Sequence, residues 1–279
     1  MKVRIIFYIS IVLGLCAHGQ VETKIIHSTA SKNVSVFNES FKIPQLNRKR
    51  RIWVYLPPNY ELSSKKYPVL YLHDGQNIFD DVTAYDGEWA IDETLNKLSK
   101  SVGLNLIVVG IDNGGDTRMS EYSPWENSQY GKAEGDSYLE FIVKTLKPEI
   151  DKTYRTKVSA KNTGIMGSSM GGLISHYAGL KYPKVFGKVG VFSPSFWYSD
   201  ESFNFTEKHA KLKHVKMYYL VGTKEGGNME GDMIKMIDLM KANKFRKSNL
   251  FEKVVQGATH SEAFWKSEFE SAVKWLFNK

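Results

Sequence analysis

Cysteine is nearly absent from this chain of 279 residues, which holds a single one, Cys16. Because a disulfide needs two cysteines, no disulfide can form within the chain, and the fold must be held by its apolar core. Proline is also scarce, with 8 residues against 22 glycines, which excludes collagen-like and proline-rich disordered chains. The 42% hydrophobic and 24% charged residues are typical of a globular protein that is long enough to bury a sizeable core.

The apolar run at the N-terminus, Ile5–Cys16, is too short to cross a bilayer comfortably. Lys2 and Arg4 precede it, and residues 17–19 offer small side chains at the −3 and −1 positions before a cut. This order is typical of a secretory signal peptide. We therefore expect residues 1–19 to be removed, and residues 20–279 to form one domain of a secreted or periplasmic protein.

A lipoprotein signal is the alternative for the same segment, with Cys16 as the acylated residue. Such signals prefer a small residue before the cysteine, whereas Leu15 is bulky. The sequence thus favours cleavage near Gly19, after which the mature chain would contain no thiol.

A single-sign basic patch is also lacking. The 38 Lys and Arg residues exceed the 30 Asp and Glu residues by eight, but they are scattered apart from one run, Arg48–Arg51. A nucleic-acid site would need a basic face with interleaved stacking aromatics. Here the run leads into Ile52–Leu56, which alternates as a strand does. We interpret it as the solvated end of a strand and expect no nucleic-acid partner.

Short apolar runs alternate with longer segments of helical spacing through most of the chain. Several of the short runs are apolar throughout, which is typical of strands covered on both faces of a largely parallel sheet. We predict an α/β fold with such a sheet. The segments before Asp74 have no helix between them, and we expect them to pair antiparallel. The predicted strands are Ile52–Leu56, Val69–Leu72, Leu106–Ile111, Thr163–Met166, Val189–Phe192, Met217–Val221 and Phe251–Val255, and the predicted helices lie near Trp89–Leu98, Ser137–Ile150, Met170–Leu180, Asp232–Ala242 and Ser261–Phe277.

The most specific motif is Gly167–Gly172, a G-x-S-x-G sequence between a predicted strand and a predicted helix. A nucleophile on a sharp turn needs neighbours without side chains, because its backbone is strained and other elements approach closely. Ser169 would then present its hydroxyl at the C-terminal edge of the sheet. A glycine-rich turn with an N-capping serine remains the structural alternative.

A serine hydroxyl needs a base to take its proton. His260 lies in Gly257–His260, directly after the last predicted strand and before the final helix, so it can reach over the nucleophile. A carboxylate that orients this histidine should follow the preceding strand. Glu225 is the first acid there, and Asp232 is the alternative, although its place in the first turn of a helix suits a dipole role. Ser169, Glu225 and His260 thus follow the Ser…acid…His order of α/β-hydrolases.

An ester hydrolase must also stabilise the oxyanion. We expect one donor to be the backbone N–H of Met170, after the nucleophile, and the other to be the N–H of Gln76, where Gly75 lets the chain turn. We expect His73 and Asp74 to brace this loop rather than to bind a metal, since no third ligand accompanies them.

With these motifs the chain resembles the putative-esterase family of α/β-hydrolases, which includes feruloyl and acetyl-xylan esterases, siderophore esterases, S-formylglutathione hydrolase and mycolyltransferases. The resemblance implies an α/β-hydrolase fold and carboxylic-ester hydrolysis without a cofactor. Ser169, Glu225 and His260 match the family triad, and Gln76 and Met170 match its oxyanion positions. The matching segments are Ile52–Pro57, Tyr67–Gly75, Glu121–Trp125, Gly167–Gly172, Phe192–Trp197 and Gly257–His260.

The substrate is less well defined. Loops after two predicted strands carry Arg118, Trp125 and Trp197, which we expect near the nucleophile. The rings could stack on a sugar or a phenolic acyl group, and Arg118 could hold an acidic group, but packing of the loop would explain the same residues. The leading hypothesis is a secreted serine esterase that acts on acyl or feruloyl polysaccharide esters or on siderophore esters. An acyltransferase that uses the same acyl-enzyme and a non-catalytic binding module are the alternatives.

Overall fold

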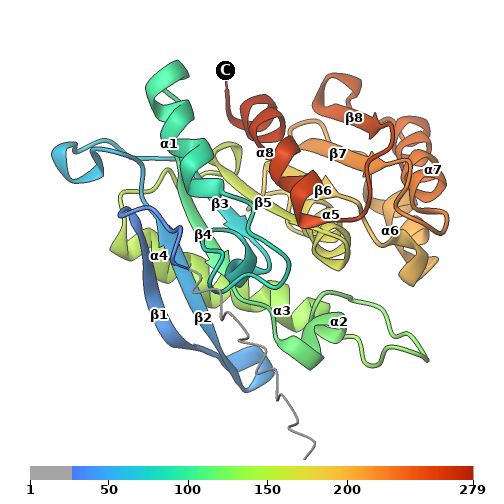
Figure 1. Cartoon of the computed structure of the whole chain (residues 1–279). Helices are drawn as coiled ribbons and strands as arrows, with labels where there is room; N and C mark the ends of the chain where they lie inside the picture. The colour runs from blue at the N-terminus through green and yellow to red at the C-terminus, as the bar shows by residue number, and fades with distance from the viewer. Residues whose placement is uncertain (1–26, 279) are drawn as a thin grey trace, which may run out of the picture.

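The computed structural model describes residues 27–278 and is built around one eight-stranded sheet (Figure 1). The expected signal segment, residues 1–19 with Cys16, lies outside the described residues. Within the described part of the chain, no helix has the length and apolar character needed to cross a membrane. The strands are β1 Val34–Ile43, β2 Arg48–Tyr55, β3 Val69–Leu72, β4 Ile107–Ile111, β5 Thr163–Ser168, β6 Lys188–Phe192, β7 Lys216–Gly222 and β8 Leu250–Val255.

The strand order is β1-β2-β4-β3-β5-β6-β7-β8. The pairs β1–β2 and β2–β4 are antiparallel, and every pair from β4 to β8 is parallel. The predicted mostly parallel sheet with antiparallel N-terminal strands is therefore confirmed. One detail is wrong: Val69–Leu72 does not pair antiparallel with Ile52–Leu56, because β4 lies between them and β3 runs parallel to it.

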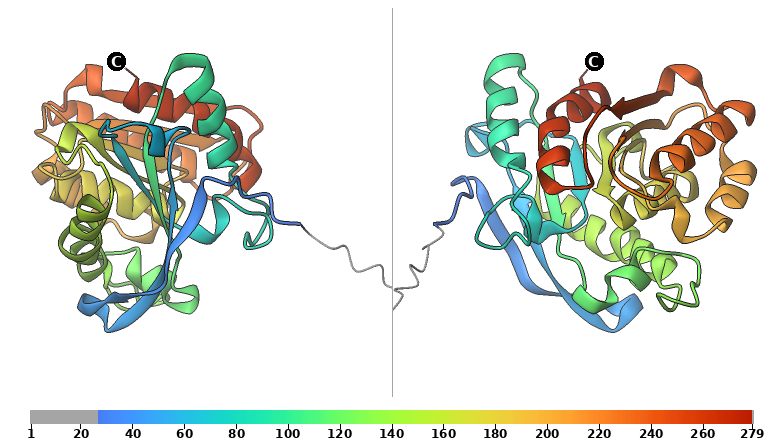
Figure 2. Two further views of the ribbon diagram at one scale, coloured as in Figure 1. Left: turned by 90° about the vertical axis from the view of Figure 1, so that its left-hand side faces the viewer. Right: turned by 45° about the vertical axis from the view of Figure 1, so that its right-hand side comes forward.

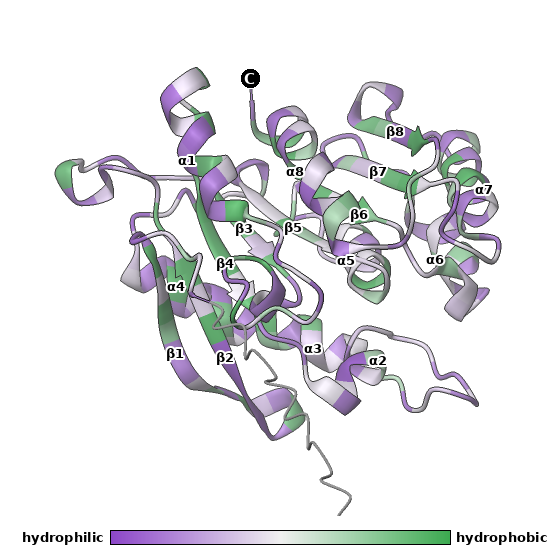
Figure 3. Cartoon of the chain, viewed as in Figure 1, coloured by the Kyte–Doolittle hydropathy of each residue, from purple (hydrophilic) through white to green (hydrophobic). Residues whose placement is uncertain are grey.

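Helices cover both faces of the sheet (Figure 2). One face packs against α1 Ile91–Val102 and α8 Glu262–Phe277, and the opposite face packs against the other long helices. Strand β3 contributes to the cores on both faces. Leu70 and Leu72 pack in the core that contains α1 and α8, and Val69 and Tyr71 pack in the core on the opposite face, which explains why this strand is apolar throughout. The hydropathy view shows the apolar character of β3 and of its neighbour β4, both of which are largely green (Figure 3). The remaining helices are α2 Arg118–Glu121, α3 Gly135–Phe141, α4 Lys147–Thr153, α5 Met170–Lys181, α6 Glu201–His209 and α7 Met229–Ala242.

Two predicted elements differ from those observed, and one strand and two α-helices were not predicted. The strand expected at Ile52 begins at Arg48, so the basic run lies inside β2. The helix expected over Ser137–Ile150 contains a π-helical turn, Ile142–Leu146, before α4. The π-helical turn runs directly into α4, and Pro148, which has no N–H to donate, is the second residue of α4. Strand β1 and the helices α2 and α6 are the unpredicted elements.

Candidate active site

Ser169 lies on a sharp turn between β5 and α5. Its φ of 58° and ψ of −122° are strained for a residue with a side chain, at a cost of about 1–3 kcal/mol. Two backbone hydrogen bonds fix the turn: Ser169 N donates to Phe192 O at 2.9 Å, and Ser195 N donates to Ser169 O at 3.1 Å. The predicted strand–turn–helix context of the motif is therefore present.

Close backbone approach explains the glycines of the motif. A Cβ at Gly172 would lie 2.6 Å from the carbonyl oxygen of Phe192, and one at Gly167 would lie 2.9 Å from the backbone of Gly171. Contacts this short with backbone cannot be relieved by turning a side chain. Side chains at these positions would therefore displace the turn that carries Ser169.

The hydroxyl of Ser169 is partly exposed and lies 3.2 Å from the hydroxyl of Ser195. Ser195 is buried and follows β6. Either hydroxyl can be the donor of this hydrogen bond. Ser195 therefore orients the Ser169 hydroxyl and leaves its proton available to a base. Ser195 lies within the Phe192–Trp197 segment, but it carries no sequence motif that would predict this contact.

His260 and Glu225 form a direct contact. Glu225 Oε2 lies 2.9 Å from His260 Nδ1, and the glutamate side chain is 1% exposed while that of the histidine is 30% exposed. A carboxylate against Nδ1 fixes the proton on that nitrogen, which leaves Nε2 with a free lone pair. The pair is thus arranged as a base with its orienting acid.

The loops that carry these two residues are joined by their backbones. Lys224 N donates to Ala258 O at 2.9 Å, and Thr223 N donates to Val255 O at 3.1 Å. Gly222 makes this approach possible, because a Cβ there would lie 2.3 Å from the Ala258 oxygen. Glu225 and His260 are therefore positioned by the register of β7 and β8.

The other oxygen of Glu225 is also saturated with donors. Oε1 accepts from Ser193 Oγ at 2.7 Å and from the backbone N–H of Gly222 at 2.5 Å. Trp265 Nε1 donates to Ser193 Oγ at 2.8 Å, and the Trp265 ring packs edge-on against His260 with 4.9 Å between centroids. Ser193 and Trp265 were missed by the sequence analysis, since serine next to a strand end and tryptophan in a helix carry no motif of their own.

Asp232, the alternative acid, lies in the first turn of α7 and accepts from the side chain of Asn228 at 2.8 Å. It is thus paired within its own helix start. The structure brings Glu225, and not Asp232, to His260.

The predicted oxyanion turn is a single 3₁₀ turn, Gly75–Asn77, that follows β3. Asp74 before it has a φ of 55°, and a Cβ at Gly75 would lie 2.8 Å from the backbone of Gly110, so the turn is pressed against β4. The side chain of Gln76 accepts from Asn113 N at 3.1 Å. Met170, the other predicted donor, is the first residue of α5.

His73 and Asp74 brace this turn, in line with the expectation. His73 is buried, its Nδ1 lies 2.8 Å from the Tyr138 hydroxyl, and burial lowers its pKa to about 3, so the ring is neutral. Burial raises the pKa of Asp74, but the ion pair with Arg118 outweighs it and holds the pKa below its usual value. Arg118 makes two contacts with this carboxylate, at 2.7 and 2.9 Å, and Asn113 makes a third.

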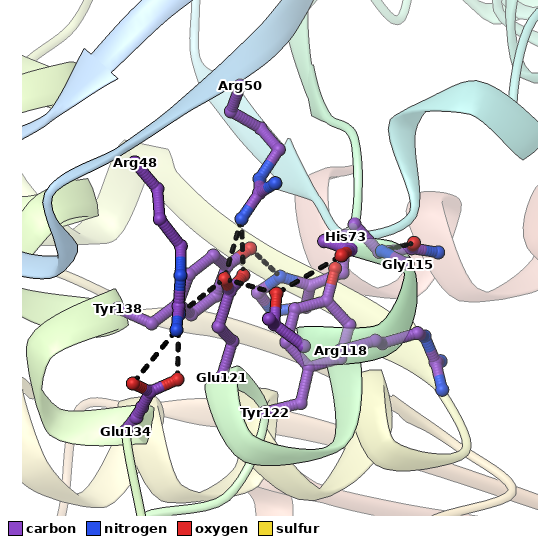
Figure 4. A network of polar contacts seen from close by, with 12 residues as sticks. Arg48, Arg50, His73, Gly115, Arg118, Glu121, Tyr122, Glu134 and Tyr138 are labelled. Atoms are coloured by element: carbon purple, nitrogen blue, oxygen red, sulfur yellow. Dashed lines mark hydrogen bonds and ion pairs between the residues drawn. The ribbon is translucent and has the colours of Figure 1, made fainter.

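The short helix α2, which carries Arg118, is tied to β2 by a buried ion-pair network (Figure 4). Glu121 is fully buried and accepts from Arg50 at 2.6 Å and from Arg48 at 2.9 Å. Glu134 accepts from both terminal nitrogens of Arg48, at 2.7 and 3.0 Å. The interpretation of this run as a solvated strand end is therefore only partly right: Lys49 is exposed and Arg48 is 28% exposed, but Arg50 forms a buried ion pair.

The two tryptophans predicted near the substrate have different surroundings. Trp125 packs edge-on against Tyr177 and Phe205, whereas Trp197 is 46% exposed and lies edge-on to Tyr130, with 5.7 Å between centroids. Asn127 Nδ2 donates to Tyr198 O at 2.8 Å, so the two loops that carry these aromatics are joined.

In the part of the chain that the structure describes, three carboxylates lie close enough to share a cation. Oxygens of Glu88, Asp92 and Glu93 lie within 4.8 Å of one another. Asp92 and Glu93 belong to the first turn of α1, where the helix dipole stabilises carboxylates. We assign no metal to this cluster.

Comparison with known proteins places these observations in a family. The family model described as "Putative esterase" matches residues 43–276. The uncharacterized protein YbbA of Bacillus subtilis (strain 168) is 28% identical over 244 residues, which is 82% of this chain and 93% of YbbA.

Two similar proteins have names that state an activity. An endo-1,4-beta-xylanase/feruloyl esterase of Xylanibacter ruminicola is 27% identical over 233 residues, 80% of this chain but 29% of that protein. An iron(III) enterobactin esterase of Dickeya dadantii is 26% identical over 248 residues, 85% of this chain and 53% of that protein. The chain thus spans about half or less of these two relatives. Among solved structures, an IroE-like serine hydrolase from Shewanella oneidensis has a TM-score of 0.69 at 22% identity, over 84% of this chain and 77% of its own, and shows the same fold.

Proposed function

The chain belongs to the putative esterase family, and from this premise we propose that it is a serine carboxylesterase that forms an acyl-enzyme on Ser169. The observation that carries the proposal is the contact of Glu225 with His260 Nδ1. The strained backbone of Ser169 at the start of α5 supports it. A fixed carboxylate, an imidazole with a free nitrogen and a serine on a tight turn are the groups that acyl transfer requires.

In the proposed mechanism the Ser169 hydroxyl turns from Ser195 toward His260 Nε2. As Oγ bonds to the ester carbonyl carbon, Nε2 takes its proton and Glu225 stabilises the resulting imidazolium. The N–H groups of Met170 and Gln76 stabilise the oxyanion. Collapse breaks the ester C–O bond, and the leaving alcohol receives the proton from Nε2.

A water molecule then reverses these roles. His260 takes a proton from water as its oxygen attacks the acyl carbon, and the proton returns to Ser169 Oγ as the carboxylic acid leaves. The net change is ester plus water to acid plus alcohol, which restores the enzyme without a cofactor.

The named relatives support two ester classes for this site, feruloyl polysaccharide esters and catecholate siderophore esters. The exposed ring of Trp197, with Tyr130 beside it, supports an aromatic acyl group that stacks on them. Purified protein should be assayed on methyl ferulate, a feruloylated oligosaccharide, an acetylated xylan and a catecholate triester. S169A is the control, and an acceptor alcohol in a second series tests for acyl transfer. If none of the esters in the panel is hydrolysed, the proposal is rejected.

Export is a separate proposal, supported by the composition of residues 1–19. The exported protein should begin near Gln20, and mass spectrometry of the intact chain decides this. A species that keeps a lipidated Cys16 would instead identify a lipoprotein.

A further inference from the structure

Glu262 has no part in the proposed chemistry, yet it links two segments that do. It is the first residue of α8 and lies two residues after His260. Its Oε1 accepts from Asn77 Nδ2 at 3.2 Å, and its Oε2 accepts from the indole N–H of Trp89. Asn77 is the last residue of the turn that contains Gln76.

Both donors are held firmly by other contacts. Asn77 N donates to Asp74 O at 2.8 Å, its carbonyl accepts from Trp89 N at 2.9 Å, and its side-chain oxygen accepts from Tyr85 N at 3.2 Å. Trp89 is buried and stacks on Phe192 with 5.7 Å between centroids. A carboxylate that spans two fixed donors fixes the start of α8 in turn.

The same tryptophan also reaches the histidine from a second direction. Trp89 packs against Trp265 at 5.8 Å between centroids, and Trp265 packs against the His260 ring. The segment that carries His260 is therefore held to the Gly75–Asn77 turn by the carboxylate of Glu262 and by a stack of indole rings.

We propose that Glu262 is a positioning residue that sets the distance between the base His260 and the oxyanion donor Gln76. This inference rests on the proposed esterase function. Transition-state stabilisation requires both groups at one carbonyl, and a displacement of about 1 Å between them can cost roughly 10²-fold in rate. A carboxylate is suited to the task because its two oxygens accept from two donors at once.

The electrostatic surroundings of Glu262 give the inference a pH signature. Burial raises the pKa of its carboxyl to about 7, with Asp74 raising it further and Arg118, Trp89 and Asn77 lowering it. His260 is the titratable group nearest to it in its own segment. When Glu262 is protonated, its O–H faces one of the two donors, and that contact is lost. The link should therefore weaken as the pH falls through about 7.

The test compares E262Q with E201Q, a control at the first residue of α6, whose carboxylate accepts from Asn204 of the same helix. On p-nitrophenyl acetate at pH 8, E262Q should lose about 10–100-fold in kcat while KM changes less than about threefold, and E201Q should keep both. As the pH falls from 8 to 6, kcat/KM of the wild type should fall relative to that of E262Q, because only the wild type loses the Glu262 link in this range. W89F, which removes one donor and keeps a stacking ring, should lose about 3–10-fold.

The NMR resonance of the Trp89 indole N–H, assigned by its absence in W89F, reports on the hydrogen bond to Glu262 independently of catalysis. It should titrate near pH 7 in the wild type and stay constant in E262Q. A resonance that does not titrate, or an active E262Q with wild-type kcat and pH profile, overturns this inference and leaves the proposed function standing. A wild type with no turnover on any ester overturns the proposed function, while the resonance still reports whether the link exists.

Discussion

Glu225 Oε2 lies 2.9 Å from His260 Nδ1, although 34 residues separate the two along the chain. They meet because β7 and β8 are parallel neighbours, so that the loops after both strands leave the same edge of the sheet. The glutamate is nearly fully buried and holds Ser193 and Gly222 with its other oxygen. Its position is thus fixed independently of the histidine, as an orienting group requires.

The assignment of the acid can be tested with two amide substitutions. Glu225→Gln keeps the shape but removes the charge that stabilises the imidazolium, and the equivalent change in a serine-protease triad costs about 10⁴ in turnover. We expect a loss of about 10²–10⁴ in kcat. Asp232→Asn should cost less than about tenfold, because that carboxylate contacts Asn228 at a helix start. Steady-state kinetics on one ester at pH 8 decide between them, and a crippled D232N beside a normal E225Q would reassign the acid.

The nucleophile can be tested in the same assay. Ser169→Ala should reduce kcat by about 10⁴–10⁶-fold, since no acyl-enzyme can form, while circular dichroism stays unchanged. Ser168→Ala is the matched control: Ser168 is the last residue of β5 and is buried. If S168A abolished turnover and S169A did not, the register of the motif would be wrong.

Those parts of the fold and site that depend on local pattern could be predicted from the sequence. β3 to β7 are apolar runs with covered faces, and their presence and their bounds to within two residues follow from that pattern. The turn that carries Ser169 could be predicted because the backbone approaches so closely at Gly167 and Gly172 that only glycine fits. His260 and Glu225 could be chosen because a parallel sheet brings successive strand ends to one edge.

The features that the sequence did not reveal depend on contacts between distant segments. Strand β1 contains five apolar residues, but only Ile43 is buried and the polar run Asn38–Ser40 interrupts the alternation, so its pattern is weak until β2 lies beside it. Arg48 and Arg50 resemble a solvated run until Glu121, about 70 residues later, is found between them. Glu262 likewise resembles an ordinary helix-start acid until Asn77 and Trp89 are seen to meet it.

The Glu121 network yields a prediction about stability. Glu121→Gln leaves Arg50 without its ion pair at a site where the arginine side chain is only 10% exposed. Breaking a buried pair in this way costs about 3–5 kcal/mol in the free energy of unfolding. Glu140→Gln, in the exposed pair with Lys144, should cost less than about 1 kcal/mol. Urea denaturation at pH 7 measures both, and equal losses would show that the network of Figure 4 adds nothing to stability.

The last prediction concerns how stability depends on pH through Glu262. Folding raises the pKa of this carboxyl from 4.5 to about 7, chiefly through burial. The folded protein therefore holds a proton that the unfolded chain releases between these two values. The contribution to stability is complete below about 4.5 and is lost as the pH rises through 7.

Glu262→Gln has no such proton to lose. The difference in Tm, variant minus wild type, should thus increase between pH 5 and pH 8, by an amount on the order of a few degrees. Glu201→Gln, at an exposed position at the start of α6, is the control that measures the effect of removing a surface carboxylate. Thermal melts in buffers of low ionisation enthalpy give the Tm of all three proteins. The effects of groups that titrate in all three cancel when the Tm of the wild type is subtracted from that of each variant. A difference that decreased with pH would mean that folding lowers the pKa of Glu262, which would contradict the pH dependence inferred for its link to Asn77 and Trp89.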